Sequence, residues 1–104
     1  MMTIGDIATF VTSKNAGPFL VAIDIVFPDQ ATYRRFVDLA ALDHDTVARL
    51  YGLPREDVVA IIHFDPANAV KVTLRRRIAS GAPGDTDVYG AQQHVPIMQH
   101  SIAW

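Results

Sequence analysis

The stretch Phe-Leu-Val-Ala-Ile-Asp-Ile-Val-Phe, residues 19–27, is the longest apolar run in the chain and decides its fold. It is rich in β-branched residues and, apart from Asp24, apolar at odd and even positions alike. That pattern is typical of a central strand covered on both faces. A polar loop containing Gly-Pro, residues 13–18, precedes the run and Pro28 ends it. We therefore expect this strand to lie inside a sheet.

Two more strands are predicted downstream, joined by a turn at residues 65–68. Residues 58–64 form a short apolar run. Residues 70–78 alternate, so that apolar and polar side chains take opposite faces. The apolar face carries Val72, Leu74 and Ile78, and the polar face carries Lys71, Thr73, Arg75 and Arg77.

Capping residues mark the expected helices. Thr3 and Asp6 form a weak capping box before a helix over residues 4–12. Asp29 is a good N-cap for a helix that runs to about residue 40. Either Asp43 or Asp45 caps a shorter helix through residue 51, which Gly52 closes.

The order of elements predicts one α+β domain spanning residues 1–104. We expect a three- to four-stranded mixed sheet with two to three helices packed against it. A single turn is expected at residues 54–57, and residues 79–96 form an ordered polar loop within the domain. Residues 97–104 are either a short edge strand or a tail that packs elsewhere.

Composition excludes several classes of protein. The net charge of −2 provides no field that would recruit nucleic acid or anionic lipid. The absence of cysteine excludes disulfides, a thiol nucleophile and thiolate metal sites. No apolar run approaches the ~18–20 residues of a membrane span, and the N-terminus lacks the pattern of a secretory signal. We expect a cytoplasmic protein.

Charged residues make up only 19% of the chain, which is low for a small domain with much surface. Either a partner covers an apolar part of the surface, or many small alanine and glycine residues inflate the hydrophobic fraction. The charge is also sorted along the chain, because residues 70–78 carry +4 while the segments on either side are acidic.

The basic strand suits a carboxylate, a phosphate or an acidic partner, because guanidinium groups bind planar anions in a bidentate manner. It lacks the interleaved aromatic residues of a nucleic-acid surface. Asp24 needs a polar rim or a partner such as Lys14 or an arginine of this strand. His63 is expected to be a hydrogen-bonded core residue, and His44 to be solvated.

The densest polar stretch is residues 84–94, Gly-Asp-Thr-Asp-Val-Tyr-Gly-Ala-Gln-Gln-His. It lacks the terminal glutamate and the spacing of a calcium loop, and His94 and His100 do not have the spacing of a helical metal pair. No metal and no cofactor are predicted. The stretch is either a self-bonded loop or a source of acid–base groups.

The chain resembles a bacterial domain-of-unknown-function family whose members occur beside, or fused to, AtuA-like (acyclic terpene utilisation) proteins. The resemblance covers about residues 3–98. It implies a small companion of such a protein in the breakdown of branched carboxylic acids or their acyl-CoA thioesters. It implies no catalytic residues. The segments that carry it are residues 13–19, 49–52, 64–67 and 80–94.

The leading hypothesis is a small subunit that docks on a large AtuA-like protein and contributes polar groups to a shared site. Arg75 and Arg77 would hold a carboxylate or CoA-type anion. The polar groups presented would be Lys14, Asn15, Asp85, Asp87, Tyr89 and His94.

Two alternatives stay open. A free-standing hydratase, isomerase or lyase acting on a carboxylate would use His94 or Asp87 as base and Tyr89 or Lys14 as electrophilic donor. In that case residues 13–15 and 85–94 line one pocket. The other alternative is a homo-oligomeric structural domain without a ligand, in which the apolar excess is a self-interface.

Overall fold

The computed structural model describes residues 2–76 and 93–104. Its centre is a four-stranded antiparallel sheet in the order β2-β3-β5-β4. The run at residues 19–27 supplies β3, which lies between β2 and β5 as expected of a central strand. The strands are β2 (Phe10–Asn15), β3 (Leu20–Val26), β4 (Val58–Phe64) and β5 (Ala69–Arg75).

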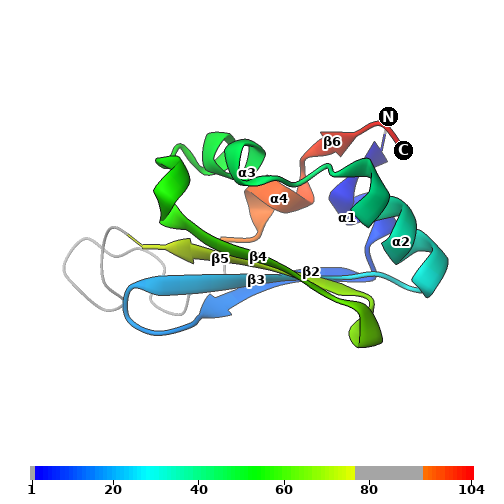
Figure 1. Ribbon diagram of the computed structural model, residues 1–104, viewed down its shortest axis with the longest axis horizontal. Coiled ribbons are helices and arrows are strands. Elements are labelled where there is room, and N and C mark those ends of the chain that lie inside the picture. Colours follow the sequence, from blue (N-terminus) through cyan, green and yellow to red (C-terminus); the bar gives the residue numbers. More distant parts are fainter. Residues whose placement is uncertain (1, 77–92) are drawn as a thin grey trace.

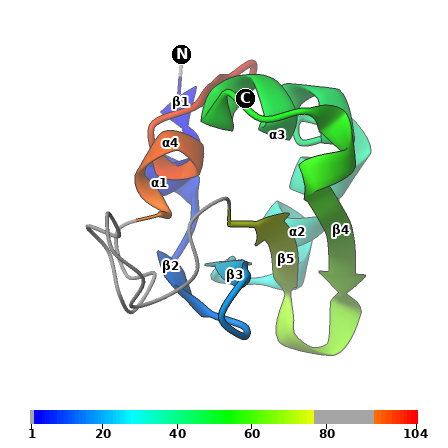
Figure 2. The same cartoon turned by 90° about the vertical axis from the view of Figure 1, so that its left-hand side faces the viewer.

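All helices of the described chain lie over one face of this sheet (Figure 1). Strand alternation points Val21, Ile23 and Ile25 of β3 towards the helices, where they are buried together with Val70 and Val72 of β5. Within residues 2–76 and 93–104, no helix lies on the other face of the sheet (Figure 2). The helices are α1 (Ile4–Ile7), α2 (Gln30–Leu39), α3 (His44–Tyr51) and α4 (Val95–Met98), with short 3-10 turns η1 (Arg55–Asp57) and η2 (Asp65–Ala67).

The predicted caps are found at α2 and α3. Asp29 accepts a hydrogen bond from Thr32 N–H, and Asp43, not Asp45, accepts one from Thr46 N–H. Gly52 closes α3 with a φ of 62°, in the left-handed region that favours glycine.

The two ends of the chain are joined by a second, smaller sheet. β1 (Met2–Thr3) pairs antiparallel with β6 (Ser101–Ile102), so the termini lie together (Figure 1). Ile4 N–H also donates to the His100 carbonyl oxygen at 3.0 Å. The tail at residues 97–104 therefore contains both the end of α4 and a short strand.

The α+β class is confirmed, and three details differ from the expectation. The sheet is antiparallel throughout instead of mixed, because β5 lies between β3 and β4. The predicted helix over residues 4–12 ends at Ile7, and β2 begins at Phe10. Val11 is buried, and it reaches the core as a strand residue opposite Ile25. No helix within residues 2–76 and 93–104 is long and apolar enough to cross a membrane.

Candidate functional site

Half of the predicted site residues fall within the described chain. Lys14 and Asn15 end β2, Arg75 ends β5, and His94 precedes α4. The other four, Asp85, Asp87, Tyr89 and Arg77, lie outside the described residues.

The two residues that flank segment 77–92 are both attached to β2. Arg76 Nη1 donates to Asn15 Oδ1 at 2.6 Å, and the Gln93 backbone N–H donates to Ser13 Oγ at 3.0 Å. Tyr51 O–H donates to the Gln93 carbonyl oxygen at 2.5 Å. The contact between Ser13 and Gln93 brings the start of the 13–18 loop region next to the end of the 84–94 polar stretch.

Strand alternation separates the predicted ligand-binding residues into two groups. Ser13 and Asn15 pair with Ile23 and Val21, so they belong to the helix-covered side of the sheet. Lys14 pairs with Ala22, on the open side. Lys71 and Arg75 are also on the open side, because they alternate along β5 with Val70, Val72 and Leu74, which are buried in the core.

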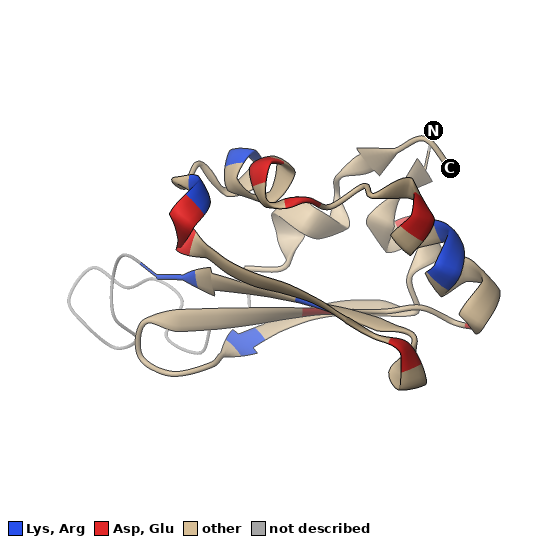
Figure 3. Ribbon diagram, viewed as in Figure 1, with Lys and Arg blue, Asp and Glu red and all other residues tan. Residues whose placement is uncertain are grey.

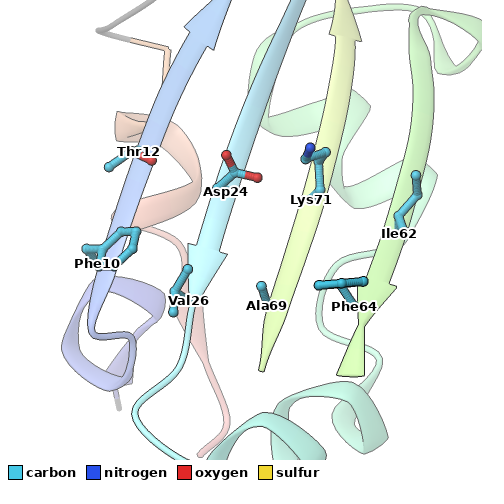
Figure 4. Close-up of a pocket in the computed structure, with 8 residues that line it drawn as sticks. All are labelled: Phe10, Thr12, Asp24, Val26, Ile62, Phe64, Ala69 and Lys71. Carbon is cyan, nitrogen blue, oxygen red and sulfur yellow. The ribbon is translucent and has the colours of Figure 1, made fainter. Parts of the chain in front are cut away.

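The open face is built from two cross-strand rows that form a groove. The first row is Phe10, Val26, Ala69 and Phe64, and the second is Thr12, Asp24, Lys71 and Ile62, each in the order β2-β3-β5-β4. These eight side chains line a groove of about 470 Å³ (Figure 4). This volume is within the range of natural binding sites.

The walls of the groove are large apolar side chains left exposed to solvent. Phe10 on β2 is 49% exposed, and Ile62 and Phe64 on β4 are 51% and 56% exposed. The strands between them carry the smaller Val26 and Ala69 at the level of the two phenylalanines. A contiguous apolar surface that stays exposed often marks an interaction site, whereas single exposed apolar side chains do not.

The polar groups of the groove lie at its centre. Asp24 and Lys71 are direct cross-strand partners, with Thr12 beside Asp24 on the other side (Figure 4). Asp24 is half-buried, and it faces the open side of the sheet in the middle of its apolar strand. The polar rim expected for Asp24 is therefore this row, and its basic neighbour is Lys71 instead of Lys14 or an arginine.

Both histidine expectations are wrong. His63 is exposed, not a core residue, because β4 is an edge strand. His44 is half-buried instead of solvated, and its Nδ1 lies 3.2 Å from the Val58 carbonyl oxygen. Within residues 2–76 and 93–104, no group of three His, Asp or Glu side chains is arranged to hold a metal ion.

A polar cluster at η2 holds the turn between β4 and β5 against α2. Tyr33 O–H donates to Asp65 Oδ1 at 2.5 Å, and Arg34 Nη2 lies 3.1 Å from Asp65 Oδ2. Burial, followed by the hydrogen bond to Asp65, raises the pKa of Tyr33 to about 12. The same hydrogen bond is the main cause that lowers the pKa of Asp65. The Phe64–Ala67 part of the resemblance contains this turn, so part of that signature stabilises a turn at one end of the groove.

Sequence reasoning missed the groove itself. The apolar run at residues 58–64 predicts a strand, but it does not show on which face of the sheet the even-numbered side chains lie. Ile62 and Phe64 point to the face on which the described part of the chain places no helix, so they stay exposed. Phe10 was placed in a helix, so its position opposite Val26 could not be found.

A protein-family model, "Domain of unknown function (DUF4387)", matches residues 4–101, nearly the whole chain. The chain belongs to the DUF4387 family. No curated protein and no solved structure matches it. The matched residues contain all four strands of the main sheet and the residues that line the groove, whereas β1 precedes them.

Proposed function

We propose that this DUF4387 chain is a small companion subunit of a large AtuA-like protein, and that it docks through the open face of its sheet. The groove between Phe10 and Phe64 is the observation that carries the proposal. Large apolar side chains at three neighbouring positions cost free energy in water, and a protein partner would remove them from it. The low charge of the chain fits the same reading.

The complex would act on branched carboxylic acids or their acyl-CoA thioesters, with polar groups of this chain completing a shared site. The contact of Gln93 with Ser13 supports that part, because it brings the two polar segments together. In this scheme Arg75 and Arg77 hold the anion. Lys14 on the open side and Asn15 on the helix-covered side border the shared site from opposite sides of β2, and Asp85, Asp87, Tyr89 and His94 supply its other polar groups.

Co-expression of the chain with an AtuA-like protein from the same genome tests the proposal. We expect a stable complex on gel filtration and a turnover of acyl-CoA substrate that depends on the small chain. If the two proteins elute separately at micromolar concentration and the small chain leaves turnover unchanged, the proposal is wrong.

A free-standing enzyme acting on a carboxylate is the second candidate, and the 3.0 Å contact between Gln93 and Ser13 favours it as well. If this candidate is right, we expect the purified chain alone to turn over a carboxylate substrate, and we expect His94→Ala to abolish that activity. Assays of the chain with and without the larger protein separate the two candidates.

A further inference from the structure

We propose that the open face binds an acidic amphipathic α-helix of about 13 residues, supplied by the larger partner. This inference rests on the proposed function and deepens it, because it names the element that fills the groove. Three properties of the face carry it: its shape, its charge and the gradient of that charge along the strands.

The shape is a trough that runs parallel to the strands. Phe10 on one edge strand and Ile62 and Phe64 on the other form its walls, and Val26 and Ala69 form its floor. Three inter-strand spacings separate the two edge strands, which is about 14 Å. An α-helix with its side chains is ~10–12 Å across, so one helix fits between the walls.

The length follows from the open face as a whole. The groove occupies the rows of Ala69 and Lys71, and β5 continues the same face with alternate residues to Arg75, which at about 3.3 Å per residue gives about 20 Å. A helix rises 1.5 Å per residue, so about 13 residues cover that length. An acyl chain is much narrower than an α-helix and would leave the side chains of the two walls in contact with water.

The charge of the face selects an acidic partner. The strand positions of the open side hold three basic residues and one acidic residue, Lys14, Lys71, Arg75 and Asp24, so this face carries +2. Figure 3 shows basic and acidic positions along the strands as blue and red segments of the ribbon. The whole chain carries −2, which leaves −4 for the remainder. Two copies meeting through this face would bring like charges together, and this disfavours self-pairing.

The charges are graded along the trough and give the bound helix a direction. Phe10 and Phe64 occupy one end, Asp24 and Lys71 come next, and Lys14 and Arg75 lie towards the other end. A helix carries partial negative charge at its C-terminus. The partner helix therefore lies with its C-terminal, acidic end near Lys14 and Arg75 and with an apolar N-terminal half between the phenylalanines.

Paired substitutions test the groove within the complex. Phe64→Asp places a charge in the wall, and Phe19→Asp is its control, because Phe19 is equally exposed at 57% but lies outside the groove. Lys71→Glu reverses the central charge, and Arg49→Glu makes the same change on α3. All four positions are exposed, and circular dichroism checks the folding of each variant, above all of Lys71→Glu, which places a carboxylate opposite Asp24.

We expect Phe64→Asp to weaken the complex by at least about tenfold and Lys71→Glu by about fivefold, with a smaller salt dependence. Both controls should stay within about twofold of the wild type. If the wild-type chain forms no complex, the proposed function and this inference both fail. If the complex forms and the groove variants bind like their controls, this inference fails together with docking through the open face, whereas the role as a companion subunit stands.

A photo-crosslinking residue in place of Ile62 identifies which segment fills the groove in the complex. The experiment is carried out at about 0.1 M salt. The expected crosslink maps to a segment of the larger protein with apolar residues three and four apart and acidic residues towards its C-terminal end. Crosslinks to a second copy of this chain, or to a segment without that pattern, would overturn the inference. The same crosslinker at Phe19 should give no such product.

Discussion

Tyr33 is only 1% exposed, yet its hydroxyl reaches the Asp65 carboxylate at the surface of η2. The raised pKa of Tyr33, about 12 against 10.0 in an unfolded chain, means that the folded protein holds this proton more tightly. That stabilisation is complete below pH 10 and is lost as pH rises from 10 to 12. Asp65 behaves in the opposite sense, because its pKa is lowered in the folded protein. The stabilisation from its ionised form is present above the pKa of the unfolded chain and is lost as pH falls.

Tyr33→Phe removes both contributions while keeping the buried ring. We expect a fall in Tm of about 4–8 °C at neutral pH, shrinking in acid and again above pH 10. Thermal unfolding followed by circular dichroism at a series of pH values measures it. Arg34→Ala is the control, because it removes the ion pair but leaves the hydrogen bond. A difference in Tm that stays constant from pH 3 to 11 would contradict this account.

Gly5 sits where α1 passes against α4. A Cβ atom there would lie 2.7 Å from Met98 Cγ and 3.1 Å from the Met98 carbonyl oxygen. Alanine in a helix ordinarily gains about 1 kcal/mol over glycine, but here the crowding should outweigh it. We expect Gly5→Ala to lower the free energy of unfolding by about 1–3 kcal/mol in urea titration. Met98→Ala in the same chain should restore only part of this, because the carbonyl oxygen remains.

At the scale of the element, α2 begins where Asp29 accepts the Thr32 N–H at 2.7 Å. This hydrogen bond, first among the causes, lowers the pKa of Asp29, so its stabilisation is present at neutral pH and is lost as the carboxylate protonates in acid. Asp29→Ala should lower Tm by about 4 °C at pH 7. Asp29→Asn keeps an acceptor, so most of the stability should remain, without the acid dependence. Equal losses for both variants at pH 7 would contradict this account, because they would show that an amide acceptor does not replace the carboxylate at the cap.

Local signals predicted the elements that depend on local chemistry. The caps at Asp29 and Asp43, the closing Gly52 and the apolar run of β3 each act within a few residues, and the structure confirms them. The β2 strand was missed because it depends on its partner. Ser13, Lys14 and Asn15 do not favour a strand by themselves, and they form one by pairing with β3.

The site depends even more on pairing than the fold does. Lys71 and Arg75 could be placed on one face from their spacing alone. That Asp24 faces Lys71, and that Phe10 and Phe64 end the same row, follows only from the order β2-β3-β5-β4. A sequence without its strand order therefore gives the charges of this face but not the trough between them.

At the scale of the whole molecule, the fluorescence of one side chain can report the pairing of β1 with β6 at the two ends of the chain. Trp104 is the only tryptophan, and its ring lies 4.3 Å from the Arg35 guanidinium carbon on α2. Ile102 beside it is buried, so β6 belongs to the core. In urea, Trp104 fluorescence and far-ultraviolet circular dichroism should therefore give the same midpoint. An earlier fluorescence transition would show that the chain ends open separately. Arg35→Ala should shift the emission of the folded state and keep the two midpoints equal.

The separation of charge also predicts how the isolated chain behaves without a partner. Its open face combines exposed phenylalanines, which favour association, with a charge of +2, which opposes pairing of two identical faces. The repulsion is screened within ~10 Å at 0.1 M salt but within ~3 Å at 1 M, whereas apolar attraction does not weaken with sodium chloride. Sedimentation equilibrium should therefore find a monomer at 0.1 M salt and weak dimers near 1 M. Phe64→Asp should remain monomeric at both, while Phe19→Asp follows the wild type. A wild-type dimer that dissociates as salt rises would mean that ionic contacts hold it, and the positive face would then not be its interface.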